Sequence, residues 1–277
     1  MIYVNCRKEN KQTTNEIDKL SVADFSEIAG CNLVITDAEG KEIISWTSGD
    51  KDSVKVSVTE KDGYCNLKYS FDEKGNLHVG GFFHDKDYTL TETRPADGYV
   101  TADAIVYQIK QKTAEDGSVS SVVSIKQEDG MYTDQEDDKT VMVDEQTHIQ
   151  LLKLDKKSGQ ALGGAKFVVT DSKGKEVMKF VTKDEAYDIT GKLVVGETYT
   201  FTEVSAPSGY QLAEPVKITI NDTSKMQTVT VKDAPFPDVP DTPQTGGTLP
   251  VFPFTAGFLG VAAVALMVWR ERGVVKK

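Results

Sequence analysis

Cysteine is scarce in this chain: its 277 residues include only Cys6, Cys31 and Cys65. Their number is odd, and neither a C-x-x-C pair nor histidines at a metal-ligand spacing accompany them. We therefore expect no metal site and no cofactor, and we do not expect disulfide bonds to be the main reinforcement of the fold. Cys31 is predicted to be a buried free thiol, and a Cys31–Cys65 disulfide is the alternative in an exported protein.

Positive charge is also in deficit, because 32 Lys and Arg residues face 43 Asp and Glu residues and the net charge is −11. Proteins that bind nucleic acids need an excess of basic side chains to neutralise phosphates, so this class of partner is excluded. The balance fits an acidic, soluble body that faces outward.

Catalytic motifs are missing as well. His78, His84 and His148 are far apart, with no serine or cysteine motif around them that would suggest a catalytic triad. We interpret these histidines as structural and predict that the protein is not an enzyme. The acidic run from Asp134 to Asp138 lacks the spacing and the glycine of a calcium loop, so it is interpreted as a solvated hairpin end.

Before residue 249, no stretch shows a sustained helical period. Apolar and polar residues instead alternate with period two, as in Val54–Val58 and Val216–Ile220. Short alternating segments separated by Gly, Asp and Asn turns are typical of β-sandwiches. The sequence therefore predicts an all-β fold.

Internal repeats indicate two copies of one domain. Ile28–Ile43 matches Leu162–Val177 at an offset of 134, and Tyr88–Tyr99 matches Tyr199–Tyr210 at an offset of 111. Because the blocks keep their order, the chain is predicted to hold tandem sandwiches. The difference between the offsets makes the first copy 23 residues longer between the blocks. We expect an extra hairpin there, around Glu60-Lys61-Asp62-Gly63 and Asp72-Glu73-Lys74-Gly75, and another hairpin turn at Glu115-Asp116-Gly117.

The chain has one long apolar run, from Leu249 to Trp269, with 21 residues and no charge. This length is enough for a helix to cross a hydrocarbon core of roughly 30 Å. A basic tail, residues 270–277, follows it, and the positive charges would keep that tail cytoplasmic. The run is predicted to be a transmembrane helix.

Immediately before this run stand Thr242, Pro243, Gln244, Thr245 and Gly246. The order of pentapeptide, apolar run and basic tail resembles the cell-wall sorting signal of Gram-positive surface proteins, usually Leu-Pro-any-Thr-Gly (LPXTG), with Thr242 in place of leucine. The resemblance implies that a sortase cysteine attacks the carbonyl of Thr245, releases Gly246 onward, and passes the chain to peptidoglycan or another pilin subunit. A plain single-pass anchor with a Pro/Gly-rich linker is the alternative.

A sorting signal would require export, but the N-terminus turns polar after a few residues and does not read as a signal peptide. We therefore expect that the sequence is truncated at its N-terminus. Ile2–Asn5 resembles a terminal strand whose Asn5 would serve a preceding domain, and a disordered arm is the alternative.

The second copy carries further motifs in order: Lys-any-Asp at 153–155, Leu-Gly-Gly-Ala at 162–165, Tyr-Thr-Phe-Thr-Glu at 199–203 and Val-Thr-Val-Lys-Asp at 229–233. This pattern resembles the Cna-B or SpaA-like prealbumin-fold domains of Gram-positive pilins and adhesins. The resemblance covers Ile149–Ala234 well and Ile17–Glu145 less closely.

In that family, an amide bond joins a lysine on the first strand to an Asn or Asp on the last, and a buried glutamate promotes it. The resemblance implies Lys153 as donor, Glu203 as promoting acid and Asp233 as acceptor. Burial favours the neutral, nucleophilic form of an amine and the protonated form of a carboxylic acid, so these residue types suit the reaction. The alternative is that the three side chains are solvated or form surface ion pairs.

In the first copy the matching residues are Lys19, Glu92 and Asp144. The pattern departs from the family at Ser21, where an aspartate would be expected. A competing register through Val22-Ala23-Asp24 offers no lysine at the donor position.

Together these patterns predict the following organisation: a remnant over 1–16, sandwiches over 17–146 and 147–234, a Pro/Gly linker over 235–248, a transmembrane helix over 249–269 and a basic tail over 270–277. We expect a wall-anchored surface protein that acts as a stalk, minor pilin or adhesin, with a host or extracellular ligand as a further partner. The lack of a Val-Tyr-Pro-Lys motif argues against a shaft pilin. The alternative is the stalk of a surface enzyme whose catalytic domain precedes this sequence.

Overall fold

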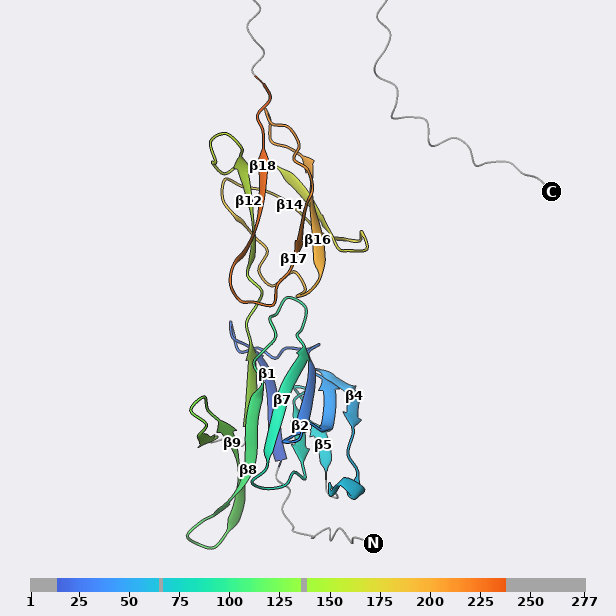
Figure 1. Ribbon diagram of the computed structural model, residues 1–277, viewed down its shortest axis with the longest axis vertical. Helices are drawn as coiled ribbons and strands as arrows, with labels where there is room; N and C mark the ends of the chain where they lie inside the picture. The colour runs from blue at the N-terminus through green and yellow to red at the C-terminus, as the bar shows by residue number, and fades with distance from the viewer. Residues whose placement is uncertain (1–13, 65–66, 136–138, 238–277) are drawn as a thin grey trace, which may run out of the picture. The chain divides into compact units, whose positions relative to one another are not determined.

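The computed structural model describes residues 14–64, 67–135 and 139–237 (Figure 1). Apart from one short 3₁₀ helix, η1 (Glu60–Asp62), the regular elements of this part are strands. The predicted all-β fold is therefore confirmed. The strands of the first half are β1 (Thr14–Ser21), β2 (Asn32–Asp37), β3 (Glu42–Thr47), β4 (Asp50–Val56), β5 (Lys68–Phe71), β6 (Leu77–Gly80), β7 (Asp87–Arg94), β8 (Ile105–Thr113), β9 (Val119–Lys126), β10 (Tyr132–Asp134) and β11 (Lys139–Asp144).

These strands form the first sandwich. A four-stranded sheet in the order β11-β1-β6-β5 packs on a seven-stranded sheet in the order β10-β9-β8-β7-β2-β3-β4. One apolar core joins the two sheets, with Ile17 and Leu77 from the smaller sheet and Leu33 and Leu90 from the larger one. All four side chains are buried.

The second sandwich contains β12 (Ile149–Asp155), β13 (Lys166–Thr170), β14 (Glu176–Val181), β15 (Tyr187–Asp188), β16 (Thr198–Ser205), β17 (Val216–Thr219) and β18 (Gln227–Asp233). Its sheets have the orders β15-β12-β18 and β14-β13-β16-β17. A separate core lies between them, built on side chains such as Leu151, Phe167, Phe201 and Val231.

Burial follows the period-two pattern of the sequence. Along β12, buried and half-buried residues alternate strictly, and along β18 buried and exposed residues alternate in the same way. Because alternate side chains of a strand point to opposite faces, Lys153 and Asp233 point into the sandwich with the apolar residues.

The first repeated block forms the same hairpin in both copies, β2–β3 and β13–β14. In each, an aspartate begins the turn and accepts two backbone N–H bonds: Asp37 from Glu39 and Lys41, and Asp171 from Lys173 and Lys175. The turn glycines, Gly40 and Gly174, have φ of 81° and 79°, a conformation that a residue with a Cβ rarely adopts.

The longer first copy differs from our prediction in one detail. Asp72–Gly75 joins β5 to β6 as expected, but Glu60–Asp62 forms a 3₁₀ helix and not a hairpin turn. Gly63 ends this helix with φ of 91°, and the Asp62 carboxylate accepts the Thr59 N–H at its start. The turn predicted at 115–117 joins β8 to β9.

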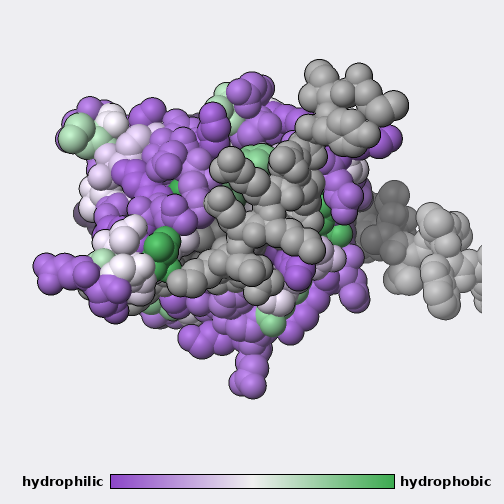
Figure 2. Space-filling model, turned by 90° about the horizontal axis from the view of Figure 1, so that it is seen from below, coloured by the Kyte–Doolittle hydropathy of each residue, from purple (hydrophilic) through white to green (hydrophobic). Residues whose placement is uncertain are grey.

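Within the described ranges, no helix is long and apolar enough to cross a membrane. The predicted span 249–269, the motif 242–246, Asn5 and Cys65 lie outside the described residues. The face of the molecule in Figure 2 is largely hydrophilic, with apolar side chains scattered among polar ones.

Candidate functional site

The first and last strands of each sandwich run parallel and side by side. In the second sandwich β12 pairs with β18 (Figure 1), with Lys153 opposite Val231 and Asp155 opposite Asp233. In the first, β1 pairs with β11, with Lys19 opposite Met142. In both, the predicted acceptor lies two residues beyond the lysine's partner and therefore on the same inward face.

In the second sandwich this register places Lys153 against two acids. Its Nζ contacts Oδ1 of Asp233 and lies 2.9 Å from Oε1 of Glu203. The side chains of all three residues are fully buried. Their charges cannot be solvated by bulk water, which strongly favours arrangements with fewer separate charges.

Glu203 is positioned by two strands and a backbone donor. It lies on β16 opposite Phe167 of β13, and its Oε2 accepts a hydrogen bond of 2.8 Å from the backbone N–H of Ala213. The other oxygen, Oε1, is the one that lies near the Lys153 amine. Burial raises the pKa of Glu203, although the Ala213 N–H and the lysine act in the opposite direction. The Lys153 Nζ also lies 5.6 Å from the centre of the Phe167 ring.

The first sandwich repeats this arrangement. Lys19 Nζ contacts Asp144 Oδ1 and lies 3.1 Å from Oε1 of Glu92, and all three side chains are buried. Glu92 Oε2 accepts a hydrogen bond of 2.8 Å from the Ala102 N–H. Burial raises the pKa of Asp144 to about 6, while the lysine opposes this shift.

The structure therefore brings together Lys153, Glu203 and Asp233, and likewise Lys19, Glu92 and Asp144. We call these two groups the second and the first Lys–Glu–Asp triad. The alternative of solvated side chains and surface ion pairs does not describe either group, because every member is buried.

The competing register in the first copy is wrong. Val22 and Asp24 lie in the exposed turn after β1, while Lys19 occupies the position of Lys153. The departure at Ser21 changes the local turn. In the second copy Asp155 accepts hydrogen bonds from Ser158 N–H and Tyr210 Oη, whereas the Ser21 hydroxyl accepts one from Ala23 N–H.

One contact was not anticipated from the sequence. The Sγ of Cys31 lies 3.8 Å from Oδ2 of Asp144, and burial raises the pKa of this thiol to about 12. Cys31 is thus a buried free thiol, as predicted. The second copy has Ala165 at this place, and within the described residues Asp233 Oδ2 has no hydrogen-bond partner. The repeat alignment equates Cys31 with Ala165, but it cannot show that the sulfur reaches Asp144.

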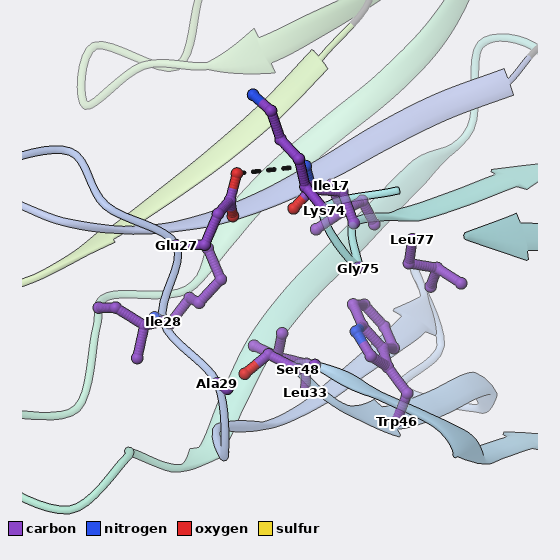
Figure 3. Close-up of a pocket in the computed structure, with 13 residues that line it drawn as sticks. Ile17, Glu27, Ile28, Ala29, Leu33, Trp46, Ser48, Lys74, Gly75 and Leu77 are labelled. Atoms are coloured by element: carbon purple, nitrogen blue, oxygen red, sulfur yellow. Dashed lines mark hydrogen bonds between the residues drawn. The ribbon is translucent and has the colours of Figure 1, made fainter. Parts of the chain in front are cut away.

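Lys19 also lines a cavity of about 60 Å³, which extends between the two sheets of the first sandwich. Figure 3 shows Trp46 and Leu77 on one side of it and Glu27 and Lys74 on another. The volume is enough for one or two water molecules. Of the first triad, only Lys19 lines this cavity.

Comparison with protein families identifies the second sandwich. Residues 147–235 match the family model described as "SpaA: Prealbumin-like fold domain". This segment has the SpaA prealbumin-like fold. No curated protein sequence matches the chain.

Comparison with solved structures also gave matches, and three of them have low sequence identity and TM-scores below 0.5. The chain is 19% identical to "The Bacillus anthracis TIE protein" over 82% of its own length and 34% of that chain, with a TM-score of 0.36. It is thus similar to about one third of that protein. The C-terminal fragment of pilus adhesin SpaC from Lactobacillus rhamnosus GG is 15% identical. This match covers 83% of our chain and 100% of the fragment, with a TM-score of 0.38. The D295N mutant of shaft pilin SpaA from the same organism is 16% identical. This match covers 82% of our chain and 99% of the pilin, with a TM-score of 0.30.

Proposed function

We propose that this chain is a cell-surface structural protein, a stalk, minor pilin or adhesin, in which each sandwich is closed by a self-formed Lys–Asp amide bond. The observation that carries the proposal is the repetition of one buried Lys–Glu–Asp triad between the first and last strands of both sandwiches. The match of residues 147–235 to the SpaA prealbumin-like domain supports it.

The proposed reaction needs no co-reactant. A neutral Lys153 amine attacks Cγ of a protonated Asp233, a C–N bond forms, one C–O bond breaks, and the oxygen leaves as water. The reaction in the first sandwich joins Lys19 to Asp144 in the same way. Each triad turns over once, so the process is self-modification and not enzymatic turnover.

Burial of the charged groups favours formation of the amide bond, and the glutamate transfers the proton that the reaction must move. An ion pair in the core carries a desolvation cost that a neutral amide does not. Glu203, whose pKa is raised by burial, can stay protonated, donate to the aspartate carbonyl, and then move the amine proton to the leaving oxygen. The Ala213 N–H holds the glutamate in place for both steps. Glu92 and the Ala102 N–H have the same roles in the first sandwich.

Intact mass spectrometry tests the crosslinks. The purified chain is expected to be lighter than its sequence by the mass of two water molecules. Glu203→Gln and Glu92→Gln should each restore one water, and the double variant should restore both, because each glutamine cannot shuttle the proton. Circular dichroism of each variant shows whether it has folded. A folded parent chain that has the full mass of its sequence would show that neither crosslink forms.

Anchoring is a separate part of the proposal and rests on the sequence of the C-terminal segment. We propose that Thr242, Pro243, Gln244, Thr245 and Gly246 are a sortase substrate, that 249–269 holds the chain in the membrane until cleavage, and that peptidoglycan or another pilin subunit accepts Thr245. Thr245→Ala should move the protein from the wall fraction to the membrane fraction. Unchanged attachment to peptidoglycan would reject sorting and leave the crosslinks unaffected.

A further inference from the structure

The outer face of the four-stranded sheet carries a row of charged side chains. Strand pairing places Glu16 of β1 directly between Lys139 of β11 and His78 of β6. Side chains at directly paired positions share one face of a sheet, so the three form a row across it. Asp72, which follows β5, also reaches this row, with Oδ2 4.0 Å from Nε2 of His78.

Three ligand-type atoms converge at this place. Nε2 of His78 lies 3.8 Å from Oε2 of Glu16, and these two atoms and the Asp72 oxygen all lie within 4.8 Å of one another. Such separations are too long for hydrogen bonds. A tetrahedral Zn²⁺ with ligands at 2.0–2.2 Å would hold its ligand atoms about 3.4 Å apart. Small side-chain rotations would therefore close the group around one ion.

Asp18 gives an independent indication that this face has too little positive charge. It lies two residues along β1 from Glu16, with its carboxyl group against that of Glu16, and it is only 8% exposed. Its Oδ1 is buried without a hydrogen-bond partner in the described part of the chain. Lys139, at 2.7 Å from Glu16 Oε1 and 3.5 Å from Asp18 Oδ2, is one cation shared by two carboxylates.

The neighbouring residues already orient the three ligands. Asp72 accepts hydrogen bonds from the backbone N–H and the side-chain amide of Asn76, at 2.8 and 3.1 Å. Lys139 holds the oxygen of Glu16 that does not face His78. Partners of this kind fix the orientation of metal ligands and commonly change metal affinity when removed.

We propose that Glu16, Asp72 and His78 form a binding site for one divalent transition-metal ion of the Zn²⁺ class. One imidazole with two carboxylates is a ligand set suited to such ions. The ion would connect β1 with the β5–β6 hairpin, and β5 has no counterpart in the second sandwich. It would thus fasten the inserted hairpin to the first strand. This proposal concerns His78, which the sequence alone led us to interpret as structural.

The second sandwich provides an internal comparison. At the offset of 134, Gln150 replaces Glu16, and its partner on the neighbouring strand is Asp188 where the first sandwich has His78. Gln150 donates a hydrogen bond to Thr228. His148 lies close enough to Asp188 to act on its charge, but among the described residues no third ligand atom joins these two, so this face is not expected to bind the ion.

Titration calorimetry of the full chain with ZnCl₂ tests the proposal. The protein carries no histidine tag, is freed of metal with a chelator, and has Cys6 and Cys65 replaced by serine, because free thiols also bind zinc. One Zn²⁺ per chain is expected. His78→Gln and Asp72→Asn should each weaken binding by at least about tenfold, and Asp188→Asn, the matched control, should leave it unchanged.

Circular dichroism in metal-free buffer establishes whether each variant is folded. If either His78→Gln or Asp72→Asn fails to fold, the other variant still tests the site. Zinc binding that both His78→Gln and Asp72→Asn retain would overturn the proposal. So would the absence of zinc binding by the folded parent chain, or a response to CaCl₂ without one to ZnCl₂.

Discussion

At the residue scale, the two triads show how burial decides the state of a charged side chain. Lys19 and Lys153 would be ordinary solvated residues on an outward face, but strand pairing turns both inward, next to two acids each. The sequence offered the lysines, the glutamates and the aspartates as candidates through the repeat and the family resemblance. It could not show the Ala102 and Ala213 N–H groups, because a backbone donor leaves no signature in residue type.

The raised pKa of Asp144 predicts how pH affects the first sandwich when its crosslink is blocked. The carboxyl has a pKa of about 6 when folded, against about 3.9 when unfolded. Between these values the folded state binds this proton more tightly, so the contribution of Asp144 to stability is greatest below pH 4 and falls as pH rises to 6. Glu92→Gln removes the smaller contribution of the Glu92 charge to this shift and keeps the larger one from burial. We therefore expect this variant to lose on the order of 1 to 3 kcal/mol from the Asp144 contribution.

Urea denaturation at pH 4 and pH 7 measures this loss. A chain that ends at residue 237 has Trp46 of the first sandwich as its one tryptophan, so fluorescence reports on the relevant core. The same variant with Asp144→Asn added is the reference, because it keeps every other carboxylate of the sandwich. An equal change in stability between the two pH values in both proteins would show that Asp144 does not titrate with a raised pKa.

The Cys31 thiol should be chemically silent in the folded protein. It is fully buried and its pKa is raised to about 12, so almost no thiolate forms at pH 8. Iodoacetamide should leave Cys31 unmodified in the native chain and modify it in urea, as peptide mass mapping would show. Modification of Cys31 under native conditions, at the rate seen in urea, would contradict the described packing.

At the scale of single elements, β1 with β11 and β12 with β18 have the same relation in both sandwiches. Each pair closes a long segment of chain, 125 residues between Lys19 and Asp144 and 80 between Lys153 and Asp233. A covalent link across such a segment restricts the unfolded chain far more than the folded one.

Loss of the proposed Lys153–Asp233 link is therefore expected to lower the stability of the second sandwich. Closing 80 residues is worth about 4.5 kcal/mol by chain entropy, so Glu203→Gln should lower the free energy of unfolding of the second sandwich by roughly this amount. Calorimetry should show its melting transition shift down while that of the first sandwich stays. Glu214→Gln, which changes an exposed glutamate, is the matched control. A shift of equal size in the control would assign the effect to charge and not to the link.

The fold was predictable from the sequence where the alternation of polar and apolar residues or the turn residues gave a clear signal. It was not predictable in short, exposed segments. Period-two alternation predicted strands, and the repeated aspartate and glycine predicted the β2–β3 and β13–β14 turns. The pattern could not show that β4 and β5 join different sheets, because both are short and largely exposed. The alternation pattern also could not predict η1, because the sequence of Glu60–Asp62 indicated a hairpin turn. Glu16 and His78 lie 62 positions apart, and strand pairing alone makes them neighbours.

At the scale of the whole molecule, the proposed crosslinks would determine how far the chain can be stretched. With the Lys153–Asp233 amide in place, tension on the ends of the second sandwich passes through the link and leaves the intervening residues folded. We expect single-molecule pulling on the parent chain to show no unfolding step from either sandwich.

The variants should release defined lengths. Glu203→Gln should add one step of about 260–290 Å, and Glu92→Gln one of about 410–450 Å, given 80 and 125 residues at 3.3–3.6 Å each. Steps of these lengths in the parent chain would show that the amides are absent or do not carry the force.

The parallel pairing of first and last strands has a further consequence for evolution by duplication. Since these strands point the same way, the chain enters each sandwich at one end and leaves at the other. If these strands were antiparallel, the chain would leave each sandwich at the end where it entered. An added copy would then not increase the distance between the units on either side of it. With the parallel pair, every duplicated unit lengthens the distance between its two neighbours. Tandem copying of this fold is thus a direct way to set how far a terminal segment stands from its attachment.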